Sequence, residues 1–295
     1  MKRVFLFPYE RKSSLYLGLL LYMMKKVITG KAAKWLTHLN DRKKQFFTSQ
    51  ETAMYLNNPS KQQVNKFLAD LVQRGLAIRI KRGLYAQVPY EVKAKEFFPN
   101  WHATGAHLAG NTNYYIGYYS ALQMHSLTTQ PSLREQIVVN KQILPAVQEI
   151  HDVKFQFIYH NEKHFFGTKK KWADSYNKVV CSDLEKTIID CLYKPDYAFG
   201  IVEIAKAIYK SYEKINCDTF LTYIEEFGSQ AVIKRFGYLV ELYQLDLPIV
   251  EKLQELITPS LVVLDPIHPK EGKINSRWRL YINTDTETIL QAPHT

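Results

Sequence analysis

The sequence contains few cysteines, and none of them has the spacing of a metal or redox motif. The three are Cys181, Cys191 and Cys217. No two of them fit a C-x-x-C pattern, which excludes the common zinc knuckles and thioredoxin-type motifs. An odd number of cysteines in a chain of 295 residues is typical of a reducing compartment. We therefore expect a cytoplasmic protein that uses no metal and no other cofactor.

Long apolar runs and the glycine-rich motifs of nucleotide-binding enzymes are also lacking. No stretch approaches the ~18 apolar residues of a membrane-spanning helix. P-loop, G-x-S-x-G and G-x-G-x-x-G patterns are absent. Gly228-Ser229 begins like a nucleotidyltransferase signature, but the metal-binding Asp-x-Asp that should follow is missing. We expect no membrane partner, and no motif argues for an enzyme.

Acidic residues are scarce in the first third of the chain. Residues 1–100 contain 19 Lys and Arg against 6 Asp and Glu, whereas residues 101–295 contain 20 against 22. The excess positive charge of the protein, +11 in total, therefore lies entirely at the N-terminal end. A basic end on a near-neutral body is typical of a module that binds a polyanion.

Residues 1–30 form an N-terminal extension with three open interpretations. A basic start is followed by an apolar part at residues 15–24 and then by two lysines. Tyrosines interrupt the apolar part, and the small residues of a signal-peptide cleavage site are missing. The segment is an ordered extra helix, a weak secretory signal, or translated sequence ahead of a true start at Met23 or Met24.

Two short helices joined by a tight turn are predicted within residues 31–88. A capping box at residues 48–51 opens the first helix, and Asn-Asn-Pro at residues 57–59 ends it. Ser60 is a good N-cap for the second helix, residues 61–74, whose apolar positions are spaced as on one helix face.

A basic hairpin is predicted directly after this second helix. Residues 76–81 alternate between apolar and polar, and residues 84–86 return as a second short strand. The tight turn between them is Lys81-Arg82-Gly83. Helix, turn, helix and a basic two-stranded hairpin is the element order of a winged helix-turn-helix, which we predict for residues 31–88.

The polar face of helix 61–74 has the residue types that read bases in the DNA major groove. Asn and Gln pair bidentately with adenine, and Lys reaches the acceptors of guanine. Basic residues on a neighbouring hairpin would lie along the phosphate backbone. An ordinary solvated helix face is the alternative, but the net charge of +6 over residues 41–90 favours double-stranded DNA as the partner. The predicted DNA-binding residues are Ser60, Lys61, Gln62, Gln63, Asn65, Lys66, Arg79, Lys81 and Arg82.

The remainder of the chain is predicted to be a connector and a mixed α/β domain, so that the fold class is α+β. The connector, residues 89–113, contains several prolines and glycines, which are typical of turns and loops. In residues 114–295 we expect strands early and helices late. Residues 114–123 are predicted to be helical. Strands are expected near residues 136–139, 153–159, 178–181 and 278–282, and helices near residues 184–192, 200–211, 218–227, 230–243 and 248–256.

The candidate catalytic residues of this domain are better explained by structural roles than by catalysis. Asp183 and Glu185 lie two residues apart, on different faces of a helix, and a capping box at residues 182–185 accounts for Glu185. His160 and His164 lack the H-E-x-x-H order of zinc proteases, and we expect both at the surface.

A run of three lysines at residues 169–171 is a second basic feature of this domain. We expect it to be a surface loop. A second nucleic-acid contact is the alternative.

The sequence resembles the AbiEi family, the antitoxin-type transcriptional regulators of type IV (AbiE) toxin–antitoxin systems, over residues 45–283. Residues 82–85 (RGLY) are similar to the family's R-x-G-x-Y wing. Residues 115–122 (YIGYYSAL) look like its Y-x-G-x-x-S-A-L segment, and residues 182–190 (SDLEKTIID) contain its D-x-E-K-T-x-x-D segment. Residues 235–239 (RFGYL) and 275–278 (NSRW) also fit.

This resemblance implies an autorepressor whose functional partner is a nucleotidyltransferase-like toxin encoded in the same operon. Residues 114–295 would then supply the antitoxin activity, with or without direct toxin contact. Two other interpretations of the residues stay open. The protein is a nucleotidyltransferase-like or other enzyme with an accessory winged helix, or it is a protein-interaction scaffold.

Overall fold

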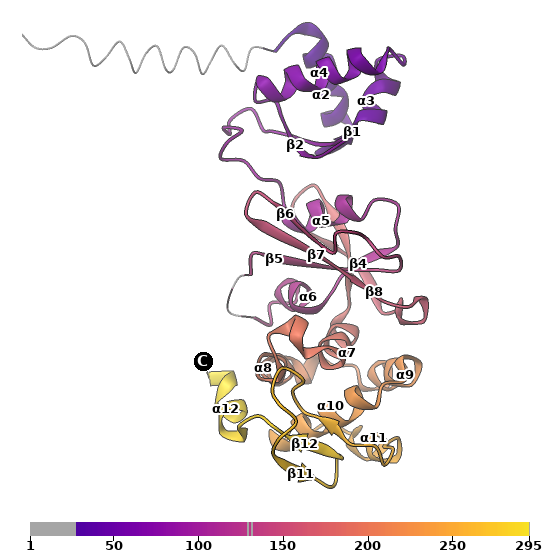
Figure 1. The fold of residues 1–295 in the computed structure, drawn as a ribbon, viewed down its shortest axis with the longest axis vertical. Coiled ribbons are helices and arrows are strands. Elements are labelled where there is room, and N and C mark those ends of the chain that lie inside the picture. Colours follow the sequence, from indigo (N-terminus) through magenta and orange to yellow (C-terminus); the bar gives the residue numbers. More distant parts are fainter. Residues whose placement is uncertain (1–27, 129, 131, 295) are drawn as a thin grey trace, which may run out of the picture. The chain divides into compact units, whose positions relative to one another are not determined.

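The computed structural model describes residues 28–128, 130 and 132–294, which form two compact units that divide after Asn100 (Figure 1). The chain mixes helices and sheets, which agrees with the predicted α+β class. Most of the predicted extension, residues 1–27, lies outside the described residues. In the part of the chain that is described, no helix has the length and apolar character needed to cross a membrane.

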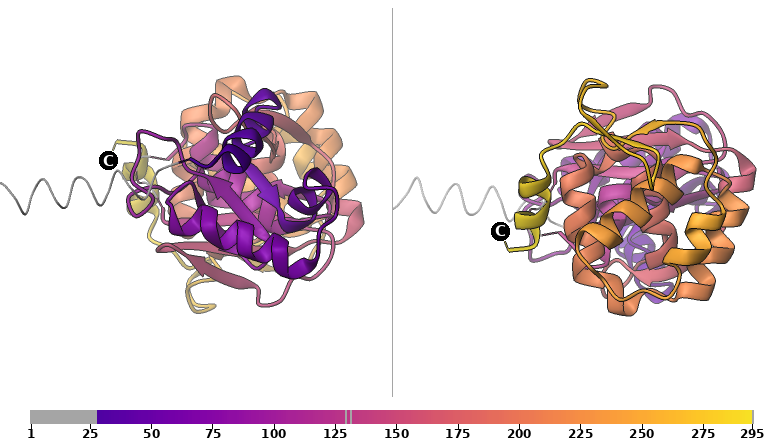
Figure 2. Two further views of the ribbon diagram at one scale, coloured as in Figure 1. Left: turned by 90° about the horizontal axis from the view of Figure 1, so that it is seen from above. Right: turned by 90° about the horizontal axis from the view of Figure 1, so that it is seen from below.

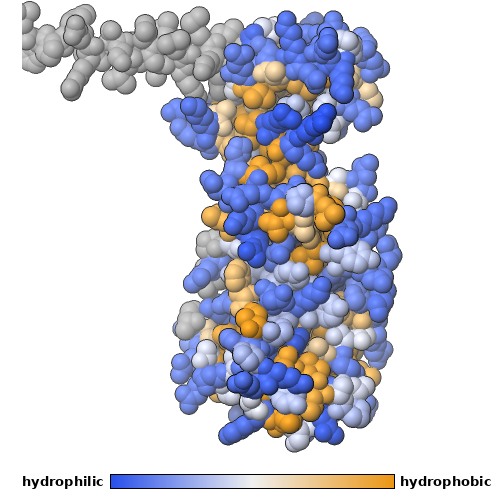
Figure 3. Space-filling model, viewed as in Figure 1, coloured by the Kyte–Doolittle hydropathy of each residue, from blue (hydrophilic) through white to orange (hydrophobic). Residues whose placement is uncertain are grey.

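In the first unit, helices pack on one small antiparallel sheet. The helices are α2 (Gly30–Asp41), α3 (Ser49–Tyr55) and α4 (Lys61–Gln73). The strands are β1 (Phe46–Thr48), β2 (Ala77–Lys81) and β3 (Leu84–Gln87), in the order β1-β3-β2. The sequence analysis predicted the hairpin of β2 and β3 but not β1. On the face shown in the space-filling view, the top of this unit is largely hydrophilic, and hydrophobic residues are visible below it (Figure 3).

The predicted capping signals define where α3 and α4 begin. Thr48 Oγ1 accepts a hydrogen bond from the backbone N–H of Glu51 (3.1 Å), and the Glu51 carboxylate accepts one from the N–H of Thr48 (2.8 Å). Ser60 and Gln63 form the same reciprocal pair at the start of α4. Gly75 follows α4 with a φ of +67°, a conformation that glycine adopts at little cost.

The core of this unit determines which side of α4 is exposed. The apolar stripe of α4 faces Trp35 of α2 and Tyr85 of β3. The stripe consists of Val64, Phe67, Leu68 and Leu71, all of them buried. Because this stripe faces the core, the polar residues predicted to bind DNA lie on the solvent side of the helix.

The second unit is built on a mixed six-stranded sheet in the order β6-β7-β5-β4-β9-β8. Its strands are β4 (Tyr114–Ile116), β5 (Arg134–Val139), β6 (Val147–Ile150), β7 (Val153–Tyr159), β8 (Thr168–Trp172) and β9 (Lys178–Ser182). Helix α5 (Trp101–Ala109) packs on one face, where Gly105 approaches the Ile137 side chain. Helices α6 (Tyr118–Met124) and α7 (Leu184–Tyr193) share a core with Val138, which points to the other face.

Two predictions about this region were wrong. Helix α5 lies inside the predicted connector, and the second unit begins at Trp101 instead of residue 114. Residues 114–123 are not one helix, because β4 and α6 are separated at Gly117. A Cβ on Gly117 would lie 2.7 Å from Val138, so the chain needs glycine where it leaves the sheet.

A group of helices and a second small sheet complete this unit (Figure 2, right). The helices are α8 (Ile201–Ser211), α9 (Cys217–Phe227), α10 (Gln230–Leu242), α11 (Val250–Glu255) and α12 (Thr286–Gln291). The strands are β10 (Val262–Val263), β11 (Lys273–Asn275) and β12 (Leu280–Ile282), in the order β10-β12-β11. Short 3-10 helices are η1 (Glu162–His164), η2 (Pro195–Ala198), η3 (Tyr212–Lys214) and η4 (Ala292–His294).

Close packing joins α10 to the segment that leads into β12. A Cβ on Gly237 would lie 2.0 Å from ring atoms of Trp278, so only glycine admits this fully buried ring. The indole N–H of Trp278 donates a hydrogen bond to Glu241 (2.5 Å). Residues 235–239 and 275–278, two of the segments that carry the family resemblance, therefore meet in the core.

Candidate nucleic-acid interface

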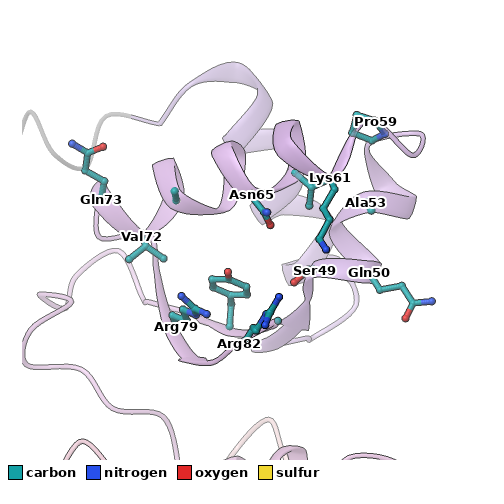
Figure 4. A pocket seen from close by; sticks show the side chains of 14 residues that line it. Ser49, Gln50, Ala53, Pro59, Lys61, Asn65, Val72, Gln73, Arg79 and Arg82 are labelled. Atoms are coloured by element: carbon teal, nitrogen blue, oxygen red, sulfur yellow. The ribbon is translucent and has the colours of Figure 1, made fainter.

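A groove in the first unit lies between α4, the start of α3 and the β2–β3 hairpin (Figure 4). Its volume is about 1120 Å³. Lys61 and Arg82 extend into it from opposite walls. The polar and charged lining residues are Ser49, Gln50, Lys61, Asn65, Gln73, Arg79 and Arg82, and the others are Ala53, Pro59, Val64, Ala69, Val72, Gly83 and Tyr85.

The groove lining is basic and contains no acidic residue. Two acidic residues on α3 and α4 already have cationic partners. Glu51 pairs with Lys44 (2.5 Å), and Asp70 pairs with Arg74 (2.8 Å). Burial raises the pKa of Glu51, but hydrogen bonds from Lys44 and Thr48 outweigh it and lower the pKa below its usual value. Both carboxylates are thus paired outside the groove, and its cations keep their net positive charge.

The structure brings four of the nine predicted DNA-binding residues together in this groove. Lys61 and Asn65 lie one helical turn apart on α4, facing Arg79 and Arg82 of the hairpin (Figure 4). Three others, Gln62, Lys66 and Lys81, are also exposed but do not line it.

Local hydrogen bonds account for the remaining two predicted residues. Ser60 Oγ accepts from the backbone N–H of Gln63 (3.4 Å), and Gln63 Oε1 accepts from the N–H of Ser60 (3.1 Å). Both side chains therefore serve the start of α4.

Sequence reasoning missed three polar lining residues, Ser49, Gln50 and Gln73. A signal for the first two was present, because the capping box at residues 48–51 already placed them at the start of a helix. Gln73 lies two steps of four residues beyond Asn65, with Ala69 between them, and all three line the groove.

The acidic residues of α7 in the second unit do not converge. Asp183 is the N-cap of α7, accepting from the backbone N–H of Lys186 (3.0 Å) and from the Tyr223 hydroxyl (3.0 Å). Glu185 accepts instead from the backbone N–H of Asn216 (2.8 Å). Within the described ranges, no group of three or more His, Cys, Asp or Glu is placed to hold a metal ion.

The predicted capping box at residues 182–185 was wrong by one residue. Ser182 belongs to β9, where its hydroxyl lies 2.7 Å from that of Thr187. Asp183 takes the capping position because the strand continues one residue further than the pattern predicted.

A buried polar cluster joins α7 to the central sheet. Lys186 forms an ion pair with Asp190, and both side chains are fully buried. Lys186 Nζ also donates to the Tyr115 hydroxyl (2.9 Å), which donates to Asp190 Oδ2 (2.9 Å). His160 Nδ1 lies 3.4 Å from the same hydroxyl, and its Nε2 lies 2.6 Å from the hydroxyl of Tyr118.

The prediction that His160 and His164 lie at the surface was wrong, because they are 2% and 7% exposed. Burial lowers the pKa of His160 from 6.5 to about 2, and the positive charge of Lys186 adds to this effect. The imidazole is therefore neutral. Its two nitrogens can then act as one donor toward Tyr115 and one acceptor toward Tyr118.

Comparison with known proteins identifies the fold alone. No family model matches the chain, and no curated protein matches it. Among solved structures, it is similar to the crystal structure of the RV2827C protein from Mycobacterium tuberculosis, with a TM-score of 0.65. That match covers 92% of this chain and 97% of the other, at 12% sequence identity.

Proposed function

We propose that the first unit is a winged helix-turn-helix that binds double-stranded DNA and that the protein is a transcriptional regulator of antitoxin type. One observation carries the DNA-binding part. The groove between α4 and the hairpin is lined by Lys61, Arg79 and Arg82 and contains no acidic residue. A concave basic surface beside an exposed helix suits the phosphates and groove edges of a duplex.

In this proposal, α3 and α4 are the helix-turn-helix and β2–β3 is the wing. The exposed side of α4 enters the major groove, whose width of about 12 Å admits one helix. Asn65 reads an adenine, and Gln62 and Lys66 extend the contact along the same side of the helix. Arg79 and Arg82 hold phosphates next to this site.

The regulatory part of the proposal rests on the family resemblance. In this proposal, the protein is a cytoplasmic repressor of its own operon, and its functional partner is a nucleotidyltransferase-like toxin. Packing between residues 235–239 and 275–278 gives these resembling segments a shared structural role. The antitoxin role of the second unit comes from the resemblance.

Arg82→Ala tests the DNA-binding proposal directly. We expect it to weaken binding to duplexes of all sequences and to reduce the slope of log affinity against log salt by about 0.9, the value for one lost phosphate contact. Lys34→Ala is the matched control, because it removes the same charge from an exposed position on α2. The measurement is a titration of duplex DNA from upstream of the gene at two salt concentrations. Absent or salt-independent binding by the wild type would overturn the proposal.

A further inference from the structure

The β8–β9 hairpin of the second unit is a basic segment at an open edge of the large sheet. Strand β8 is last in the strand order, so one side of its backbone has no neighbouring strand among the residues that the structure describes. The predicted surface loop at residues 169–171 is part of this strand. Residues 168–180 contain four lysines and one acidic residue, although residues 101–295 are net negative.

The four lysines of this hairpin divide into two groups. Lys171 Nζ donates to the carbonyl of Met124 at the end of α6 (3.1 Å), and Lys169 Nζ lies 4.0 Å from Asp183. These two have contacts within the unit. Lys170 lies two residues before Trp172, and Lys178 is paired directly with Trp172 across the strands, so all three share one face of the hairpin.

Two large aromatic side chains are exposed beside these lysines. Trp172 is 62% exposed and Tyr176 is 69% exposed, whereas Trp35 and Trp278 are buried in the cores of their units. Lys178 Nζ lies 4.3 Å from the centre of the Trp172 ring. An indole held in solvent next to a cation is a platform on which a nucleic-acid base can stack.

We propose that this hairpin surface, formed by Lys170, Trp172, Tyr176 and Lys178, binds single-stranded nucleic acid. A base stacks on Trp172, and the lysines hold the adjacent phosphates. RNA and single-stranded DNA share this chemistry. The site is separate from the proposed duplex site, because both its residues and its ligand differ.

Four other uses of this surface fit less well. Lysine alone would protect an open sheet edge from aggregation, but an exposed tryptophan would increase that risk. Protein interfaces are enriched in tryptophan and tyrosine but depleted in lysine. A membrane-inserting hairpin would have an apolar tip, whereas this turn is held by Asp174, which accepts from the backbone N–H of Tyr176 and Asn177. In a duplex, stacked bases would leave Trp172 without a partner.

The test compares Trp172→Ala with Tyr159→Ala in the full-length protein. Tyr159 is the matched control, because it is 55% exposed and lies on β7, with three strands between it and β8. Labelled oligouridine and oligothymidine are titrated and binding is followed by fluorescence anisotropy, with quenching of tryptophan emission as a second readout. We expect Trp172→Ala to weaken binding by roughly 5- to 150-fold, the range for one lost base–aromatic stack.

Four further results complete the test. Trp172→Phe should retain most of the affinity, and Tyr159→Ala should equal the wild type. The fold loss in single-strand affinity caused by Trp172→Ala should be the same with and without Arg82→Ala, so that failure of this proposal and failure of duplex binding are distinguishable. A preference for oligouridine or for oligothymidine would identify which single strand is the ligand. Equal oligonucleotide binding by the wild type and Trp172→Ala would overturn the proposal. It would also be overturned if the wild type bound phosphatidylserine vesicles and Trp172→Ala, but none of the other variants, lost that binding.

Discussion

Each unit contains a lysine–carboxylate pair, and the two pairs have different surroundings. In the first unit, Lys44 and Glu51 are 47% and 33% exposed. In the second unit, Lys186 and Asp190 are fully buried beside the ring of Tyr115. The first pair stays solvated and contributes little to folding, whereas the second lost its water on folding.

The difference in burial between the two pairs determines whether their charges interact with water or with each other. Burial lowers the pKa of Lys186 and raises that of Asp190, and the attraction between the two opposes both shifts. Each therefore depends on the other, and on Tyr115, to remain buried. In the first unit, Lys61 and Arg82 stay in water, where their charge is available to a ligand. In our proposal, the exposed cations of the groove serve binding, whereas the buried pair of the second unit serves the fold.

Removing one partner of the buried pair should have the largest effect. We expect Lys186→Met to lower the free energy of unfolding by about 3–5 kcal/mol, because it leaves the Asp190 carboxylate buried without a cation. Urea denaturation measures this loss. Duplex affinity per folded molecule should not change, because Lys186 is buried within the other unit.

The double variant Lys186→Met/Asp190→Leu is the control for this prediction. Replacing both charges with apolar groups removes the unpaired carboxylate, and much of the lost stability should return. A loss below about 1 kcal/mol in Lys186→Met, as is typical of an exposed pair, would contradict the contrast between the two units.

The pH dependence of stability should show the second largest effect, through His160. Its pKa is about 2 in the folded protein and 6.5 when unfolded, so that only the unfolded chain takes up a proton between these values. The stability that neutral His160 contributes to the folded protein is complete above pH 6.5 and is lost as the pH falls toward 2. Between pH 7 and pH 5 this loss is about 2 kcal/mol.

His160→Gln should remove this part of the slope, measured as the free energy of unfolding at several pH values. The matched control is His268→Gln, which changes an exposed histidine of the same unit. If the free energy of unfolding depends on pH equally in the wild type and in His160→Gln, the prediction is contradicted, and the His160 imidazole is not held neutral by burial.

Local signals predicted the first unit well and long-range contacts in the second unit poorly. The capping boxes, the apolar stripe of α4 and the change to alternation after Gly75 are each visible within a few residues. Strand β1 was missed because its three residues are held by pairing with β3, almost forty residues later. The split between β4 and α6 was missed for the same kind of reason, because contact with Val138 makes glycine necessary there.

The candidate sites follow the same division. Lys61, Asn65, Arg79 and Arg82 were predicted because exposure on a helix or hairpin can be inferred from periodicity. The buried cluster was not predicted, because Tyr115 and His160 contact residues that are 75 and 45 positions away in sequence. Helical spacing of Lys186 and Asp190 was a visible signal for their pairing, although it did not reveal their burial.

The smallest effect should come from the exposed pair of the first unit. We expect Lys44→Ala to change the free energy of unfolding by at most about 1 kcal/mol, because solvent screens this pair and Glu51 keeps its hydrogen bond from the N–H of Thr48. Urea denaturation with and without added salt measures the change, which should shrink as salt screens the pair. Lys34→Ala should show no such salt effect. A loss in Lys44→Ala as large as that in Lys186→Met would mean that exposure does not separate the two pairs, and the functional contrast between the units would lose its physical basis.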